Sequence, residues 1–91
     1  MDTIEKKYWV YLIECGDKSI YTGIAVDVEA RYAQHISGKG ARYTRAHAPR
    51  KILKTFECAN RSEALKAEYR IKQLSAAAKR VFCKTPGGQL P

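Results

Sequence analysis

The sequence predicts an α+β fold, in which a small three-stranded antiparallel sheet is flanked by helices in the order β-β-α-β-α-α. Residues 9–15 (WVYLIEC) and 20–26 (IYTGIAV) are rich in the β-branched and aromatic side chains that favour strands. Only the turn-like GDKS separates the two runs, so we expect them to pair as an antiparallel hairpin. Segments with helical periodicity lie before and after a third strand-like run, and this order favours a sheet covered by helices.

The first helix is predicted over residues 27–37, before the glycines of the SGKG segment. Asp27 is a residue type that caps helix N-termini well. Arg31 and His35 are four residues apart and fall just beside the apolar stripe of this helix. We therefore expect both at the edge of the buried surface, where a cleft can form. The stripe itself consists of Val28, Tyr32 and Ile36.

The second half of the chain predicts one strand and a longer helix. Residues 38–50 form a loop with room for one helical turn, and residues 50–59 alternate well enough for a third strand. Asn60 then caps a helix, with Glu63 three residues later in a capping box. Glu68 borders the apolar stripe of this helix, which consists of Ala64, Ala67, Ile71, Leu74 and Ala78.

A length of 91 residues indicates one domain, residues 1–91. We expect its core to span about 8–83. Ser75 is expected to cap a short final helix that runs to about Phe82, and residues 84–91 are expected to form a flexible tail.

The sequence indicates a reducing, cytoplasmic environment. No run of about eighteen apolar residues is present, so no membrane span is expected. The first residues lack the apolar core and cleavage site of a secretory signal. The three cysteines, Cys15, Cys58 and Cys83, are widely spaced and odd in number, with no zinc-like pattern. We expect all three to be buried free thiols.

The charge points to a polyanionic partner. Seventeen Lys and Arg against nine Asp and Glu give a net charge of +8. Residues 38–54 contain six of these basic residues and no acid. The flexible part of this segment, with Lys39, Arg42, Arg45 and a Tyr43 available for stacking, suits contact with a nucleic-acid backbone. Free phosphate, an acidic protein, anionic lipid or a merely soluble loop are the alternatives that composition leaves open.

Two tyrosines and one Arg/His pair are candidates for chemistry on phosphate. Tyr11 and Tyr21 lie on adjacent strands of the hairpin, where they either pack or present a phenol to a phosphate or a water. Arg31 and His35 share one helix face. Arg can bind phosphate oxygens and neutralise charge, and His can transfer a proton near neutral pH. The alternative for this pair is an ordinary solvated flank of the helix.

Glu68 is the candidate metal ligand. A hard divalent ion such as Mg²⁺ prefers oxygen donors and keeps several waters, so one carboxylate suffices if phosphate and water supply the rest. The alternative is an exposed or salt-bridged glutamate. The second histidine, His47, lies in the basic loop and is predicted to be a surface residue.

In their order and spacing, these residues resemble the GIY-YIG nuclease superfamily, in particular its small, stand-alone, bacterial (UPF0213-like) members. The resemblance covers about residues 8–83. It rests on Val10-Tyr11-Leu12, Tyr21-Thr22-Gly23 ten residues on, DVEARYAQH (27–35), SGKGARYT (37–44) and EALKAEYRIKQL (63–74). The sequence departs from the family pattern by having VYL for GIY and YTG for YIG. It also has Ile24 where some relatives carry a lysine.

The resemblance implies a role for each candidate. Tyr21 would deprotonate the attacking water, and Tyr11 would orient water or phosphate. Arg31 would hold and neutralise the scissile phosphate, while His35 would assist proton transfer. Glu68 would anchor one divalent ion, Mg²⁺ or Mn²⁺.

The resemblance also implies a function. Gly23 would let the backbone pass close to the site and the nucleic acid. The chain would be a metal-dependent endonuclease that hydrolyses phosphodiester bonds in structured or damaged DNA, as in DNA repair. Relatives usually borrow a second domain for DNA targeting, so a partner protein would supply targeting here. The alternatives are a catalytically weak nucleic-acid-binding module on the same scaffold, or a basic partner subunit.

Overall fold

The computed structural model describes residues 6–85 and confirms the predicted α+β fold. Its three strands form one antiparallel sheet with the order β2-β1-β3, so that β1 is the central strand. The strands are β1 (Tyr8–Cys15), β2 (Ile20–Ala25) and β3 (Pro49–Cys58). The helices are α1 (Val28–Ile36), α2 (Arg42–Ala46), α3 (Arg61–Lys72) and α4 (Ala76–Lys84).

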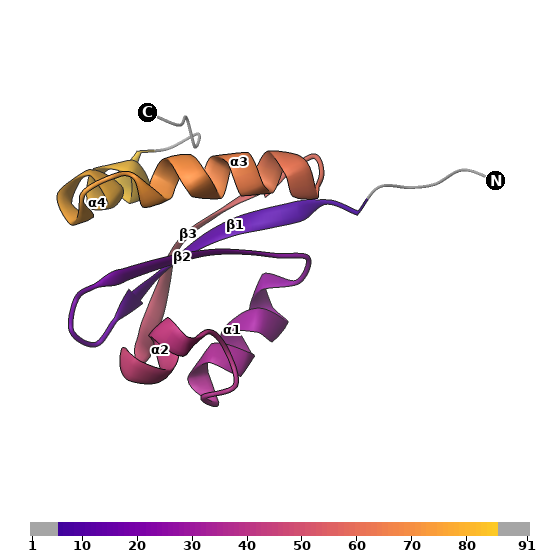
Figure 1. Cartoon of the computed structure of the whole chain (residues 1–91). Coiled ribbons are helices and arrows are strands. Elements are labelled where there is room, and N and C mark those ends of the chain that lie inside the picture. The colour runs from indigo at the N-terminus through magenta and orange to yellow at the C-terminus, as the bar shows by residue number, and fades with distance from the viewer. Residues whose placement is uncertain (1–5, 86–91) are drawn as a thin grey trace.

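The sheet is covered on both faces, with α3 and α4 on one side and α1 and α2 on the other (Figure 1). Alternate residues of β1 therefore enter two different cores. Val10 and Leu12 pack in the core beneath α3 and α4, whereas Tyr11, Ile13 and Cys15 belong to the core on the α1 side. A strand buried on both faces reads as a continuous apolar run, which explains the unbroken VYLI of the sequence.

The predicted N-caps of the longer helices are confirmed by side-chain hydrogen bonds. Asp27 accepts from the Ala30 amide at 3.1 Å and Asn60 accepts from the Glu63 amide at 2.9 Å. On α3 the predicted stripe is buried at Ala64, Ala67 and Ile71. Its last two positions, Leu74 and Ala78, are only half-buried, because α3 ends at Lys72 and the chain changes direction before α4.

The predicted stripe of α1 is wrong at its C-terminal end. Ile36 is 59% exposed, whereas His35 is only 1% exposed. The reason is the loop that follows, where Gly38 has a φ of +81° and turns the chain back. Gly40 then packs directly on the His35 ring, so the returning chain covers His35 and leaves Ile36 in solvent.

Other boundaries differ slightly from expectation. The single helical turn expected in the basic loop is α2, and α4 continues to Lys84 rather than ending near Phe82. The flexible tail was expected from residue 84; residues 86–91 lie outside the described part of the chain. No helix within residues 6–85 is long and apolar enough to cross a membrane.

The cysteines are free thiols, as expected, but only Cys15 is fully buried. Cys58 and Cys83 are half-buried at the margin of the core under α3 and α4. Cys58 ends β3, an edge strand, and Cys83 lies in the last helix, so neither is enclosed by the sheet.

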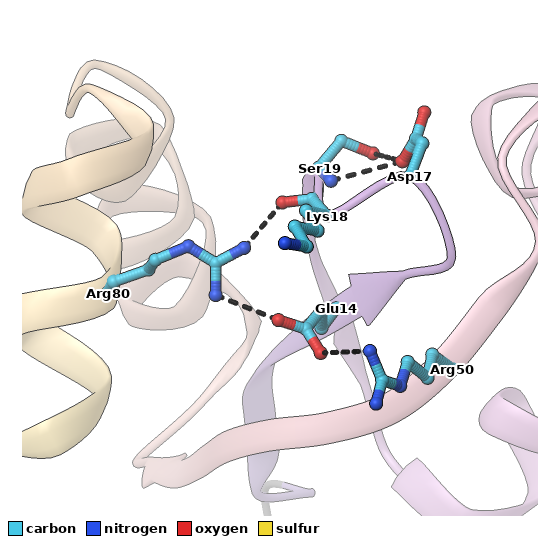
Figure 2. A network of polar contacts seen from close by, with 6 residues as sticks. All are labelled: Glu14, Asp17, Lys18, Ser19, Arg50 and Arg80. Carbon is cyan, nitrogen blue, oxygen red and sulfur yellow. Dashed lines mark hydrogen bonds and ion pairs between the residues drawn. The ribbon is translucent and has the colours of Figure 1, made fainter.

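An ionic network that sequence analysis did not foresee ties α4 to the end of the hairpin (Figure 2). Glu14, at 7% exposure, accepts a hydrogen bond of 2.8 Å from Arg80 and lies 3.8 Å from Arg50. Arg80 also donates to the carbonyl of Lys18 in the β1–β2 turn. The hydrogen bond from Arg80 is the main cause that holds the pKa of Glu14 below its ordinary value. One arginine thus fixes both a strand and the turn after it.

The packing of the Tyr11 ring requires a glycine at position 23. The two residues face each other across β1 and β2, and a Cβ at position 23 would fall on the Tyr11 hydroxyl. The missing side chain therefore lets the phenol extend over β2, an edge strand, toward the rim of the sheet.

Replacing Gly23 with alanine should destabilise the fold by about 1–3 kcal/mol, because the added methyl displaces a tightly packed ring. Gly16→Ala is the matched control, since a Cβ there meets nothing nearer than the Ala48 carbonyl at 3.8 Å. Urea unfolding of both variants measures the difference. Equal stabilities would show that the Tyr11 ring does not need the space above Gly23.

Candidate active site

The centre of the candidate site is a buried chain of hydrogen bonds from three elements. The Tyr11 hydroxyl on β1 lies 2.9 Å from Nε2 of His35 on α1. Nδ1 of His35 lies 2.6 Å from the hydroxyl of Thr44 on α2. All three side chains are at most 2% exposed. His35 is thus not at the edge of the buried surface, as its helical position suggested, but inside it.

Arg31 lies one helical turn before His35 and is half-buried. One of its guanidinium nitrogens donates to Gln34 at 2.7 Å. Arg31 is also close enough to the Tyr11 hydroxyl to lower the pKa of this phenol against the larger effect of burial. A phosphate bound by Arg31 would therefore lie next to this phenol.

The surroundings keep both buried groups neutral near pH 7. Burial, and then the neighbouring Tyr21, raise the pKa of Tyr11 to about 12, although nearby Arg31 opposes the rise. Burial, and then the positive charge of Arg31, lower the pKa of His35 below its ordinary value. The pair is therefore a phenol beside an uncharged imidazole, which can accept a proton.

Glu68 belongs to the helical layer of α3 and α4, on the opposite face of the sheet from α1. It lies on α3 with its side chain 17% exposed and forms an ion pair of 3.2 Å with Lys72 one turn later. Burial is the main cause of the raised pKa of Tyr11, and the negative charge of Glu68 adds to it. This places Glu68 within electrostatic reach of the phenol.

The Glu68 carboxylate suits a hard divalent ion such as Mg²⁺ or Mn²⁺. Within residues 6–85, no group of three or more His, Cys, Asp or Glu side chains could hold a metal. A protein cage for zinc is therefore absent from this part of the chain. A single carboxylate is sufficient for Mg²⁺, which keeps its waters and takes further oxygens from a phosphate.

Tyr21 is held by aromatic contacts. Its ring meets the edge of His35, with centroids 5.3 Å apart, and stacks on Tyr43 at 5.7 Å. Tyr43 in turn stacks on His47 at 4.2 Å, and Nδ1 of His47 pairs with Asp17 at 2.5 Å. His47 is therefore a half-buried part of this stack rather than the surface residue that we expected. Tyr43 keeps 37% of its surface exposed.

The basic segment is divided between two regions of the surface. Lys39, Arg42 and Arg45 are exposed around α2, and no acid within residues 6–85 pairs with them. By contrast, Arg50 forms an ion pair with Glu14, and Lys54 donates a hydrogen bond to the Thr85 carbonyl beside α4. Only the first group lies next to Thr44 and the stack.

Comparison with known families shows to which family the chain belongs. The family model of the GIY-YIG catalytic domain matches residues 7–81. The chain belongs to the GIY-YIG family. This confirms the resemblance found in the sequence.

Its relatives include UPF0213 proteins. One from Cupriavidus necator is 49% identical over 87 residues, which are 96% of this chain and 90% of that protein. Another, from Halobacterium salinarum, is 50% identical over 70 residues, which are 77% of this chain and 91% of that protein. The solution NMR structure of a UPF0213 protein from Bacillus halodurans matches with a TM-score of 0.57 and 40% identity, covering 90% of this chain and 87% of that one.

The candidate residues come from four elements. Tyr11 and Tyr21 have ring centroids 6.3 Å apart on one face of the hairpin. The ring of His35 on α1 contacts both tyrosines and Arg31 lies one turn before it, whereas Glu68 on α3 pairs with Lys72. The space above Gly23 is filled by Tyr11, so this glycine acts through the phenol. The chemical roles of these residues stay predictions.

Sequence reasoning missed two residues of the candidate site. Thr44 hydrogen-bonds His35, and Gly40 leaves room for the His35 ring, since a Cβ there would fall on Nδ1. Thr44 gives no signal of its own in the sequence, because a threonine in a basic loop has no distinguishing pattern. Gly40 was recognised only as part of a helix stop.

The lowered pKa of His35 predicts a loss of stability in mild acid. The unfolded chain protonates His35 near the ordinary value of 6.5, whereas the folded chain protonates it only at lower pH. Between these two values the unfolded state binds more protons, so the free energy of unfolding falls as the pH falls. Urea unfolding between about pH 7.5 and pH 5 measures the slope.

The variant His35→Gln should lose this part of the slope, whereas His47→Gln should keep it. Identical pH profiles for the wild type and His35→Gln would contradict a buried, neutral His35.

Proposed function

We propose that this GIY-YIG chain is a metal-dependent endonuclease that hydrolyses phosphodiester bonds in DNA, with structured or damaged DNA as its substrate. The observation that supports this most is the convergence of a phenol, an uncharged imidazole and a guanidinium. The phenol is Tyr11, which hydrogen-bonds His35 and whose pKa is affected by nearby Arg31. These are the three groups that attack of water on phosphorus needs: a proton path, a base and a charge that binds phosphate.

Arg31 supplies the phosphate contact. Its guanidinium is partly exposed and beside the Tyr11 hydroxyl, so a phosphate that it binds is held next to the proton path. A fork of N–H donors stabilises the charge that develops on the phosphate oxygens during displacement.

Tyr11 and His35 remove the proton from water. As the attacking oxygen bonds to phosphorus, its proton passes to the Tyr11 oxygen, and the Tyr11 proton passes to the imidazole. The phenol ends unchanged and His35 ends as the cation. The hydrogen bond between the two residues supports this order, whereas within residues 6–85 Tyr21 has ring contacts but no hydrogen bond to a base. Tyr21 borders the phosphate in this proposal.

Glu68 would hold the Mg²⁺ or Mn²⁺ ion, whose positive charge stabilises the leaving oxygen. In the protein alone, this carboxylate forms an ion pair of 3.2 Å with Lys72. The exposed Lys39, Arg42 and Arg45 around α2 would contact the phosphate backbone on either side of the scissile bond.

A second candidate function is a nucleic-acid-binding module with little catalysis. Two observations favour it: Glu68 is already paired with Lys72, and Tyr11 is only 2% exposed. In both functions the basic surface around α2 binds the polyanion, and a partner protein would supply targeting.

Nicking of branched and single-stranded DNA with Mg²⁺ tests the enzyme. Arg31→Ala and Glu68→Ala should each lower the rate about 10²–10³-fold, because each removes charge stabilisation of the transition state. The matched controls are Arg70→Ala and Glu63→Ala, which replace an exposed arginine and a lysine-paired glutamate on α3. Both controls should cleave like the wild type.

Equal trace cleavage by the wild type and Glu68→Ala would reject the endonuclease. If the protein then still binds DNA with an affinity that falls steeply with salt, the binding module is the correct function.

The same assay distinguishes the roles of Tyr11 and Tyr21. Tyr11→Phe should lower the rate about 10²–10⁴-fold, because phenylalanine cannot pass a proton to His35. Tyr21→Phe keeps the ring stack and should have a smaller effect. The reverse ranking would return deprotonation of water to Tyr21, the role that the family resemblance implies.

A further inference from the structure

We infer that Thr44 is a positioning residue that fixes the tautomer of His35, so that Nδ1 carries the proton and Nε2 faces the Tyr11 hydroxyl as an acceptor. The consequence for catalysis rests on the proposed function; the assignment of the tautomer does not.

Thr44 has two contacts for its single hydroxyl proton, the carbonyl of Ala41 at 3.0 Å and Nδ1 of His35 at 2.6 Å. The carbonyl can only accept, whereas Nδ1 can donate or accept. Both contacts are therefore satisfied only when Thr44 donates to Ala41 and accepts from a protonated Nδ1, which leaves the lone pair on Nε2.

Tyr11 favours the same tautomer. Among the hydrogen bonds of residues 6–85, Nε2 of His35 at 2.9 Å is the acceptor within reach of the Tyr11 hydroxyl proton. If Nε2 carried a proton, the buried Tyr11 proton would have no partner. Each end of the chain of hydrogen bonds thus favours a protonated Nδ1.

Burial makes this choice strict. Tyr11, His35 and Thr44 are 2%, 1% and 2% exposed, so solvent does not compete for their polar atoms. The opposite tautomer would place two protons against each other at Tyr11 or leave one without a partner, and a buried unpaired donor is costly.

The local fold explains how Thr44 reaches the ring. Because Gly40 has no Cβ, the chain passes directly over His35. Helix α2 then begins at Arg42 and places Thr44 inward, while Arg42 and Arg45 on the same short helix are exposed. One helix therefore presents charge to solvent and a hydroxyl to the imidazole.

The tautomer is measured directly by long-range ¹H–¹⁵N correlation spectra of the full chain with labelled histidine at about pH 7.5. The wild type should show a protonated Nδ1 and an unprotonated Nε2 for His35. Thr44→Val keeps the shape but removes the hydroxyl, and should move at least half of the population to the Nε2–H form. Thr44→Ser should restore the wild-type spectrum, and the exposed Thr55→Val is the matched control.

A wild-type His35 protonated at Nε2 would overturn the assignment, and this measurement needs no variant. A folded Thr44→Val protein with the wild-type tautomer would overturn the role of Thr44.

The nicking assay separates this inference from the proposed function. Thr44→Val should lower kcat at least about two-fold with KM for DNA unchanged, in proportion to the population that leaves the Nδ1–H form, and Thr44→Ser should keep kcat, because a wrong tautomer blocks proton transfer without weakening binding. A wild type with the expected tautomer but no cleavage would reject the endonuclease and leave the role of Thr44 intact. Equal kcat for Thr44→Val and the wild type, with the tautomer changed, would reject its part in catalysis.

Discussion

The hydrogen bond between Tyr11 and His35 is the constraint on which the candidate site depends. It joins the central strand to the helical layer that covers one face of the sheet. Three other features exist because of it: the bare backbone at Gly23 beneath the phenol, the bare backbone at Gly40 above the imidazole, and the inward hydroxyl of Thr44. Two glycines thus make room for one buried polar contact, and each would collide with it if it carried a side chain.

Local chemistry made much of the fold predictable. The N-caps Asp27 and Asn60 bind amides three residues away. The apolar run of β1 reflects its burial on both faces. Each of these features can be predicted from a short stretch of sequence. The burial of His35 instead of Ile36 could not be read in this way. It depends on a loop that turns back at Gly38 and covers one side of α1, which is a tertiary effect that helical periodicity does not contain.

The candidate site was likewise predictable from the sequence only in part. The family pattern singled out Tyr11, Tyr21, Arg31, His35 and Glu68 as candidates, but which tyrosine hydrogen-bonds the histidine is set by sheet pairing and side-chain direction. The basic segment is a second example. It is continuous in the sequence, yet Lys39, Arg42 and Arg45 surround α2 while Lys54 lies over the ring of Phe82 beside α4. Charge that is contiguous along a chain need not form one surface.

Lys72 is a counter-ion for Glu68 within the protein itself, because the two side chains form an ion pair. Under the proposed function, a divalent cation bound by Glu68 would displace the ammonium group of Lys72, so breaking this ion pair would weaken the binding of the cation. The displaced ammonium group would then be free to attract the phosphates of a nucleic acid. Cation and polyanion would therefore strengthen each other's binding.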